Sequence, residues 1–132
     1  MNKIGVSQKA IIFNKDKFLV LKRGITAPSN PNKWDLPGGD VDFGEDAYDS
    51  MKREIKEETG LIIDKLEPYD VYSKVNEIGN FWVTIAYKGD TNEENIQLSY
   101  EHSDYRWVNY EEAQQLNIVD KIKIFIDKRY DR

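Results

Sequence analysis

The sequence predicts a mixed α/β fold in a single domain that spans residues 1–132. Three observations predict it. Short runs of β-branched and aromatic residues, typical of strands, recur along the chain, and one long segment of strong helix formers, residues 45–59, interrupts them. With 132 residues and 39% apolar side chains, the chain can bury one core but is too short for two. Strands and helices are therefore expected to pack as layers around that core.

The first part of the chain is expected to be sheet. Ile4–Phe13 and Lys17–Lys22 are rich in strand formers, and the polar segment Asn14–Asp16 between them suits a hairpin connection. Gly24–Lys33 holds two prolines and two asparagines without periodicity, which predicts a long loop. A short strand over Trp34–Leu36 is predicted to follow it.

One helix is predicted with particular clarity over Glu45–Thr59. Acidic residues occupy its first turn, and Gly60 stands where a left-handed C-terminal cap would lie. At 100° per residue one stripe of the helix is apolar and is expected to face the core. This stripe consists of Ala47, Tyr48, Met51 and Ile55.

The rest of the chain is predicted to return to sheet and to end in helices. Three further strands are expected, over Leu61–Ile63, Asp70–Val75 and Phe81–Tyr87. After a polar turn region, the expected elements are a strand over Tyr105–Val108, a helix over Tyr110–Leu116 capped by Asn109, and a helix over Ile118–Tyr130.

The composition excludes several classes of function. Lys and Arg number 19 against 24 Asp and Glu, a formal net charge of -5, so no general basic surface is expected that would bind polymeric nucleic acid or acidic lipid. The absence of cysteine excludes disulfides and thiolate sites, and the single histidine, His102, excludes a histidine-built metal site. The apolar runs are strand-sized and no signal-like start occurs. We expect a soluble, cytoplasmic protein without a membrane segment.

The most informative feature is a cluster of acids inside the predicted helix. Glu54, Glu57 and Glu58 are spaced i, i+3 and i+4, so they share one face about 5–6 Å apart, where like charges cost about 0.2–0.5 kcal/mol per pair. A solvated, salt-bridged face is the ordinary explanation of clustered charges, but it needs cations. At helical spacing only Glu57 has one, Arg53. A further cation is therefore expected from outside the helix.

A divalent metal ion is the natural missing partner of these acids. Lys52 and Lys56 point away from the acidic face, so the helix itself does not supply the charge. Ligands that are all oxygen suit Mg²⁺ or Mn²⁺, and such ions bridge phosphate oxygens. An acidic protein could bind an anionic polyphosphate in this way.

The same residues match a family pattern in full. It runs from Gly39 over five residues to Glu45 and over seven more to Arg53-Glu54-Ile55-Lys56-Glu57-Glu58-Thr59-Gly60-Leu61. This spacing resembles the Nudix box of the Nudix hydrolases, and weaker similarity extends over Trp34–Gly38 and Glu101–Glu112. The resemblance implies a Nudix-type α/β/α sandwich with a central mixed β-sheet. It also implies metal-dependent hydrolysis of a diphosphate linkage in a nucleoside diphosphate joined to another moiety.

The resemblance assigns roles to residues of the box. Glu57 and Glu58 would be metal ligands, Glu54 a ligand or the general base, and the Gly39 carbonyl a further ligand. Arg53 would orient the carboxylates, as its i,i+4 relation to Glu57 also suggests.

Three residues outside the box are candidates for the site, each with a simpler alternative. Glu101 resembles the later acid that many Nudix enzymes use as an extra ligand or base, and its alternative is an ordinary exposed loop acid; Asp104 competes for the role. Arg23 is expected either to contact a substrate phosphate or to be a surface arginine. Trp34 is expected either to stack on a base or to pack beneath the loop.

The substrate is the least determined part of the interpretation. We expect a nucleoside triphosphate, oxidised ones included, because the chain is short and markers of other subgroups are absent between Val75 and Gly79. An ADP-ribose or nucleotide-sugar pyrophosphatase and a non-catalytic, nucleotide-binding regulatory domain are the alternatives, although the intact box argues against the latter. Because the family is often dimeric, a homodimer is an open expectation.

Overall fold

The computed structural model describes residues 3–130. Within them the strands are β1 (Ile4–Asn14), β2 (Lys17–Arg23), β3 (Trp34–Asp35), β4 (Gly38–Asp40), β5 (Glu67–Val75), β6 (Phe81–Asp90) and β7 (His102–Val108). The helices are α1 (Ala47–Thr59), α2 (Tyr110–Ala113) and α3 (Asp120–Tyr130). None of the helices in this described part has the length and apolarity needed to cross a membrane.

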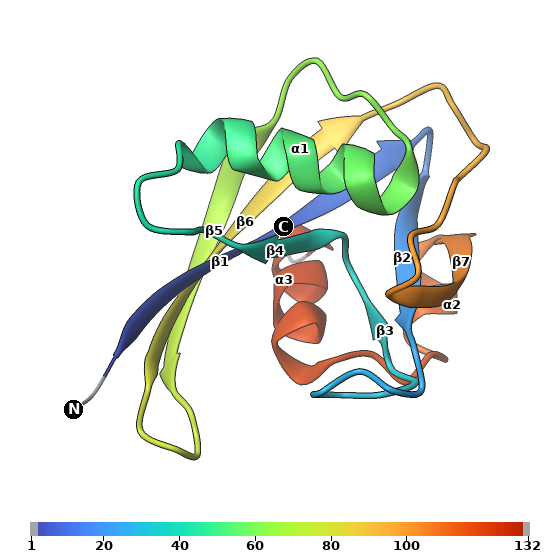
Figure 1. Cartoon of the computed structure of the whole chain (residues 1–132). Helices are drawn as coiled ribbons and strands as arrows, with labels where there is room; N and C mark the ends of the chain where they lie inside the picture. The colour runs from blue at the N-terminus through green and yellow to red at the C-terminus, as the bar shows by residue number, and fades with distance from the viewer. Residues whose placement is uncertain (1–2, 131–132) are drawn as a thin grey trace.

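The strands of residues 3–130 form one seven-stranded mixed sheet (Figure 1). Its main path runs β3-β2-β1-β6-β5, in which β1 and β6 are parallel and the other neighbours are antiparallel. Outside this path, β7 pairs with β2 and β4 pairs with β1. β1 pairs with β2 only at Phe13 and Asn14, and over Ser7–Lys9 it pairs with β4 instead. This change of partner brings the strand that precedes α1 onto the centre of the sheet.

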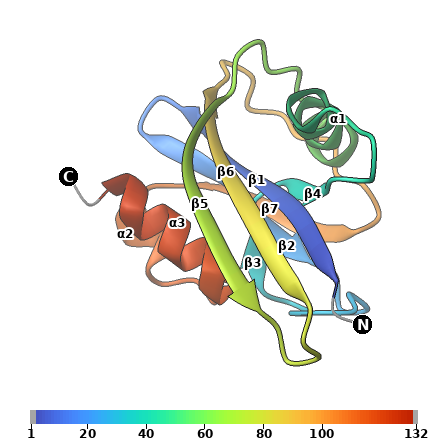
Figure 2. The same cartoon turned by 90° about the vertical axis from the view of Figure 1, so that its left-hand side faces the viewer.

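Helices cover both faces of the sheet. Figure 2 shows α1 on one side and α2 with α3 on the other. Because successive side chains of a strand point to opposite faces, the central strands supply both cores. The core beneath α1 contains Ala10, Ile12, Leu19 and Leu21 from the strands, with Met51 and Ile55 from the helix. The layered arrangement of helix, mixed sheet and helix agrees with the expected sandwich.

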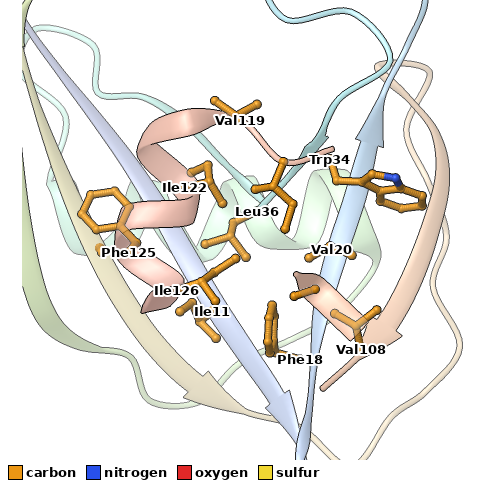
Figure 3. Packing of buried hydrophobic residues seen from close by; sticks show 13 residues of the cluster. Ile11, Phe18, Val20, Trp34, Leu36, Val108, Val119, Ile122, Phe125 and Ile126 are labelled. Carbon is orange, nitrogen blue, oxygen red and sulfur yellow. The ribbon is translucent and has the colours of Figure 1, made fainter. Parts of the chain in front are cut away.

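The second core lies between the sheet and α3 (Figure 3). Ile11, Phe18 and Val20 alternate with the residues of the first core along β1 and β2. The helical partners are Ile122, Phe125 and Ile126, all buried and spaced so that they share one face of α3.

Helix α1 has the Gly60 C-cap that its sequence predicts, and its N-cap is Asp46, which was expected inside the first turn. The Asp46 side chain accepts a hydrogen bond from the Asp49 N–H at 2.9 Å, and Gly60 has a left-handed φ of 80°. The helix begins at Ala47 rather than at Glu45. The reason is that Glu45 belongs to the preceding turn, in which its carboxylate accepts from the Asp42 N–H at 2.8 Å.

The expected strand over Leu61–Ile63 is wrong. Leu61 and Ile63 are buried and Ile62 is exposed, so the segment has the alternation of a strand. Within residues 3–130, however, no strand pairs with it, because it only crosses over the first core on its way from α1 to β5. Alternation shows which side chains are buried and does not show whether the backbone has a partner.

One additional strand and several element boundaries also differ from expectation. β3 ends at Asp35, β5 begins at Glu67, β6 ends at Asp90 and α3 begins at Asp120. β4 was not expected, because Gly38 and Gly39 are poor strand formers. β7 begins at His102 rather than Tyr105, since it follows β2 past an irregularity between Lys22 and Arg23. α2 ends at Ala113 rather than Leu116, although its Asn109 cap is present as predicted.

Candidate active site

The site begins where β4 meets β1 and α1. Gly38 lies so close to β1 that a Cβ there would be 1.9 Å from the Gln8 carbonyl oxygen. At Gly39 a Cβ would be 2.8 Å from Cδ of Glu54 and about as close to both carboxylate oxygens. Gly38 therefore requires glycine, whereas a side chain at Gly39 would displace the Glu54 carboxylate, which rests directly on the backbone of β4.

Arg53 holds together the carboxylates at one edge of α1. Its Nη1 donates to both oxygens of Glu57 at 2.9 and 3.1 Å, and its Nη2 donates to Glu45 at 3.0 Å. Nη2 also lies 3.5 Å from Glu54 Oε1. The expectation that Glu54 has no cation within the helix is therefore wrong, because an adjacent residue with a long side chain reaches it. Arg53 thus contacts three acids of the site, Glu45, Glu54 and Glu57.

Glu58 is the buried acid of the cluster. It is 5% exposed, and its Oε1 accepts a hydrogen bond from the Gly38 N–H at 2.9 Å. Burial raises the pKa of Glu58 from 4.5 to about 8, although the Lys9 ammonium and the Gly38 N–H act in the opposite direction. Burial also raises the pKa of Glu54, against the effect of Arg53. Without a further cation, the surroundings of Glu58 and Glu54 therefore favour the protonated form of both carboxyl groups over the charged form.

A buried ion-pair cluster forms the opposite side of the site. Asp35, with a side chain only 3% exposed, accepts from Lys9 Nζ at 2.9 Å and from Arg23 Nη1 at 3.0 Å. Burial alone would raise the pKa of Asp35, but Lys9, the Leu36 N–H and Arg23 outweigh it and lower the pKa below its usual value. Asp35 is therefore charged and holds both cations in place.

His102 and Glu101 enter from the start of β7. Pairing of His102 with Arg23 and a hydrogen bond from the Gly24 N–H to the Glu101 carbonyl at 3.1 Å fix this segment next to β2. Glu101 is exposed, and its charge raises the pKa of both Glu54 and Glu58, so it faces the same acids. Burial lowers the pKa of His102 to about 4, which keeps the ring neutral at pH 7.

These groups line one cavity of about 730 Å³. Its walls come from β1, the loop after β2, β4, α1, the start of β7 and the start of α3. Six of the eight residues expected in the site line it, namely Arg23, Gly39, Glu54, Glu57, Glu58 and Glu101. Arg53 stands just behind them, bound to Glu57. Arg23 and Glu101, which lie 78 positions apart in the sequence, thus meet around one cavity.

Trp34 is the exception among the expected site residues. It is 5% exposed, belongs to the core beneath α3 and does not line the cavity. Its ring lies under Lys22 and Arg106, at 5.9 and 5.2 Å from the ring centre. The ring is therefore a core residue packed against the start of α3 and is not positioned to stack on a base in the cavity. An aromatic ring at the rim comes instead from Tyr100, which is 98% exposed.

The acids of the cavity do not form a ready-made metal cluster. Within residues 3–130 no three acidic or histidine side chains converge as ligands of one ion. The Glu57 carboxylate is turned onto Arg53, and Glu58 is bonded to the Gly38 N–H. The donor set nevertheless fits a hard divalent ion, because it consists of oxygens and includes a buried carboxylate whose charge needs a partner.

Sequence reasoning missed several polar residues that line the cavity, among them Lys9, Asp35 and Lys121. Asp35 lies between the apolar Trp34 and Leu36, and a charged residue in such a position was the available signal. Lys9 follows Ser7 and Gln8 in β1, so its neighbours gave no such signal. Lys121, in the first turn of α3, gave no signal beyond an ordinary surface lysine. Its place in the cavity depends on how α3 packs.

Comparison with known proteins gives a consistent assignment. The NUDIX domain family profile matches residues 3–128. The nucleoside triphosphatase NudI of Escherichia fergusonii is 28% identical over 118 residues, which cover 82% of this chain and 84% of that protein. The asymmetrical bis(5'-nucleosyl)-tetraphosphatase of Mus musculus is 34% identical over 108 residues, or 76% and 69% of the two chains.

The structural comparison agrees with these matches. The crystal structure of the MutT protein from Methanosarcina mazei Go1 superposes with a TM-score of 0.83 at 30% identity, covering 99% of this chain and 95% of that one. The resemblance inferred from the box between Gly39 and Leu61 and the expected α/β/α sandwich are both confirmed. Fold, motif and family profile together show that this chain belongs to the Nudix hydrolase family.

Proposed function

We propose that this chain hydrolyses nucleoside triphosphates, oxidised ones included, at a phosphoanhydride bond with Mg²⁺ or Mn²⁺ as cofactor. The observation that carries the proposal is one cavity in which the acidic face of α1 lies opposite Arg23. The substrate class is supported by the similarity to a protein named as a nucleoside triphosphatase and to a MutT protein. The reaction class follows from membership of the family.

The metal would be held by oxygen ligands of α1 and β4. Nudix hydrolases generally use divalent metal ions, and the carboxylates of Glu54, Glu57 and Glu58 with the Gly39 carbonyl are the hard donors such ions prefer. When bound, the ion would neutralise charge on phosphate oxygens and lower the pKa of water. The raised pKa of Glu58 supports this role, because burial penalises its carboxylate form until a cation offsets the penalty.

Glu54 is the preferred general base, with Glu101 as the second candidate. Its carboxylate is fixed between Gly39 and Arg53, so it accepts a proton from a defined position. Its raised pKa makes it a stronger base than an exposed glutamate. Glu101 faces the same acids but is exposed and lacks such support.

Arg23 and Tyr100 would bind the substrate. Arg23 is anchored by Asp35 and by the Ser29 carbonyl at 2.9 Å, while its Nη2 makes only a long 3.4 Å contact with Ser29 Oγ. That nitrogen would donate to a phosphate oxygen. Tyr100 offers an exposed ring at the rim, on which a base could stack in place of the buried Trp34.

A product analysis tests the proposal. The purified protein is incubated with a panel of nucleoside triphosphates, ADP-ribose, nucleotide sugars and phosphomonoesters in Mg²⁺ or Mn²⁺ and in EDTA. We expect turnover of triphosphates only with metal, and in ¹⁸O water the label should enter a phosphate product. Millimolar metal should also raise the melting temperature, because a ligand of the folded state stabilises it.

Other outcomes would contradict the proposal. Faster turnover of ADP-ribose or of a nucleotide sugar would transfer the assignment to that substrate. Turnover that persists in EDTA would contradict the metal dependence. Binding of nucleotides without any turnover would favour the regulatory alternative.

A further inference from the structure

The cavity has an acidic side and a basic side. The acidic side consists of Glu54, Glu57, Glu58 and Glu101. The basic side consists of Lys9, Arg23 and Lys121, grouped around Asp35. The electrostatic influences on Lys121 come mainly from this second group and from Asp40, not from the acids of α1. Lys121 therefore lies on the basic side of the cavity, near Asp35 and Asp40.

Lys121 differs from the other two cations in having no partner. Lys9 donates to Asp35 at 2.9 Å and to the Leu36 carbonyl at 3.4 Å. Arg23 is bound by Asp35 and by Ser29. For Lys121, by contrast, no hydrogen bond or ion pair with any of residues 3–130 is present. It is the cavity cation that remains available to a ligand.

The position of Lys121 is fixed by contacts that have nothing to do with its charge. A short parallel bridge joins Trp34 to Ile118. In it the Trp34 N–H donates to the Asn117 carbonyl at 2.8 Å, and the Val119 N–H donates to the Trp34 carbonyl at 3.0 Å. This bridge holds the first turn of α3 beside β3, so Lys121 is held at the wall of the cavity.

Folding stability does not account for a lysine at this position. The first turn of a helix disfavours cations, because the helix dipole is positive there. Lys9 and Arg23 add like charge nearby, which Asp35 and Asp40 offset only in part, and burial lowers the pKa of the Lys121 ammonium. A neutral side chain would avoid all three costs. The charge of Lys121 is therefore better explained by something that the cavity binds.

We propose that Lys121 binds the terminal phosphate of a nucleoside triphosphate and so selects triphosphates over diphosphates. The inference rests on the proposed function, in which the metal held by α1 binds the two phosphates whose shared anhydride bond is cleaved. An ammonium donates three hydrogen bonds, accepts none and binds phosphate as a point charge. A phosphate offsets the excess positive charge at this end of the cavity, whereas a neutral base carbonyl does not.

Substrate preference tests this role. We would measure kcat/KM for ATP and ADP with the wild type, Lys121→Met and Lys121→Arg. Lys123→Met is the matched control, because Lys123 is exposed on the same helix and does not line the cavity. Lys121→Met should lower kcat/KM for ATP by about 10- to 100-fold, the size expected for a lost charged hydrogen bond, and that for ADP by less than about threefold. Lys121→Arg should keep most of the preference, and Lys123→Met all of it.

A binding measurement makes the test independent of turnover. Calorimetry with inorganic tripolyphosphate and pyrophosphate should show that Lys121→Met weakens only tripolyphosphate binding. Equal losses of kcat/KM for ATP and ADP would overturn the proposal. So would a loss of kcat/KM that differs between triphosphates of different bases while the affinity for tripolyphosphate is unchanged. If the wild type hydrolyses no nucleotide, the proposed function fails, and the tripolyphosphate result alone then supports or overturns the role of Lys121.

Discussion

The carboxylate of Glu54 lies directly against the α-carbon of Gly39, so that a methyl group at position 39 would come within 2.8 Å of Glu54 Cδ. Gly39→Ala should therefore displace the carboxylate. Since a misplacement of about 1 Å can cost about 100-fold in rate, kcat should fall by roughly that factor. The clash falls on the end of a flexible side chain, so the melting temperature should change little. Kinetics and thermal unfolding of the same variant check both parts.

Gly44→Ala is the control for this variant. Gly44 lies in the loop between β4 and α1 with a φ of +87°, and a Cβ there would meet nothing within 4 Å. The strained backbone should cost roughly 1 kcal/mol of stability and leave kcat unchanged. The same kinetic loss in both variants would show that backbone change in the loop, and not contact with Glu54, limits turnover.

Glu54→Gln separates catalysis from stability. The substitution keeps the shape of the side chain but removes the charge of the proposed base, so turnover should fall by roughly 10²–10⁴-fold. Without metal, the free energy of unfolding should stay level or rise, because burial and neighbouring acids disfavour the charge that is removed. Kinetics in Mg²⁺ and denaturant unfolding in EDTA measure the two effects.

Lys56→Gln is the matched control on the exposed side of α1 and should leave turnover nearly unchanged. Wild-type turnover of Glu54→Gln would remove Glu54 from the mechanism. The equivalent substitution of Glu101 would then be the next test of the base.

The pKa of Glu58 predicts how stability depends on pH in EDTA. Its pKa is about 8 in the folded protein and near 4.5 when unfolded. The folded state therefore keeps the proton over a range in which the unfolded state has released it. The contribution to stability is full below about pH 4.5 and is lost as the pH rises through about 8, at most about 1.4 kcal/mol per pH unit. Denaturant unfolding at a series of pH values measures the slope.

Glu58→Gln should remove this pH dependence, because an amide does not titrate. The variant should be more stable than the wild type at pH 8 in EDTA and should gain less from added Mg²⁺. A wild-type slope that survives the substitution would mean that another group is responsible.

Asp35→Asn should destabilise the fold strongly. It leaves Lys9 and Arg23 without the carboxylate that binds both, in a place where the carboxylate is 3% exposed. Removal of one partner from a buried ion pair costs about 3–5 kcal/mol. Glu67→Gln provides the comparison, because the pairs of Glu67 with Lys65 and Lys88 are exposed and its loss should cost less than about 1 kcal/mol. If denaturant unfolding showed similar losses of the free energy of unfolding for both variants, the buried ion pairs of Asp35 would be no stronger than the exposed pairs of Glu67.

Local sequence predicted α1 and its acidic face, because everything that determines them lies within a few residues. The Gly60 C-cap and the stripe with Met51 and Ile55 depend on local backbone preferences and on a period of 3.6 residues. The i, i+3, i+4 spacing of the three glutamates likewise places them on one face without reference to any other element.

Side-chain partners across the fold could not be predicted in this way. The sequence showed no partner for the Glu58 carboxylate within the helix, whereas in the fold the Gly38 N–H of β4 donates a hydrogen bond to it. It also left open two roles for Trp34, and only the packing of α3 against β3 decided that the ring is buried. Leu61 and Ile63 are buried as their alternation indicates, yet only the sheet order showed that their backbone has no partner strand.

The sequence by itself thus determined the helix, its acids and the family they identify, since these depend on short-range spacing. Only the tertiary structure decided that Lys9, Asp35 and Lys121 face those acids across one cavity. These residues lie around one cavity because β1 pairs with β4 in place of β2 and because α3 packs beside β3. Both contacts join residues that are far apart in the chain. The physical reason is that burial and pairing of charges are set by which distant segments pack together, and no local pattern carries that information.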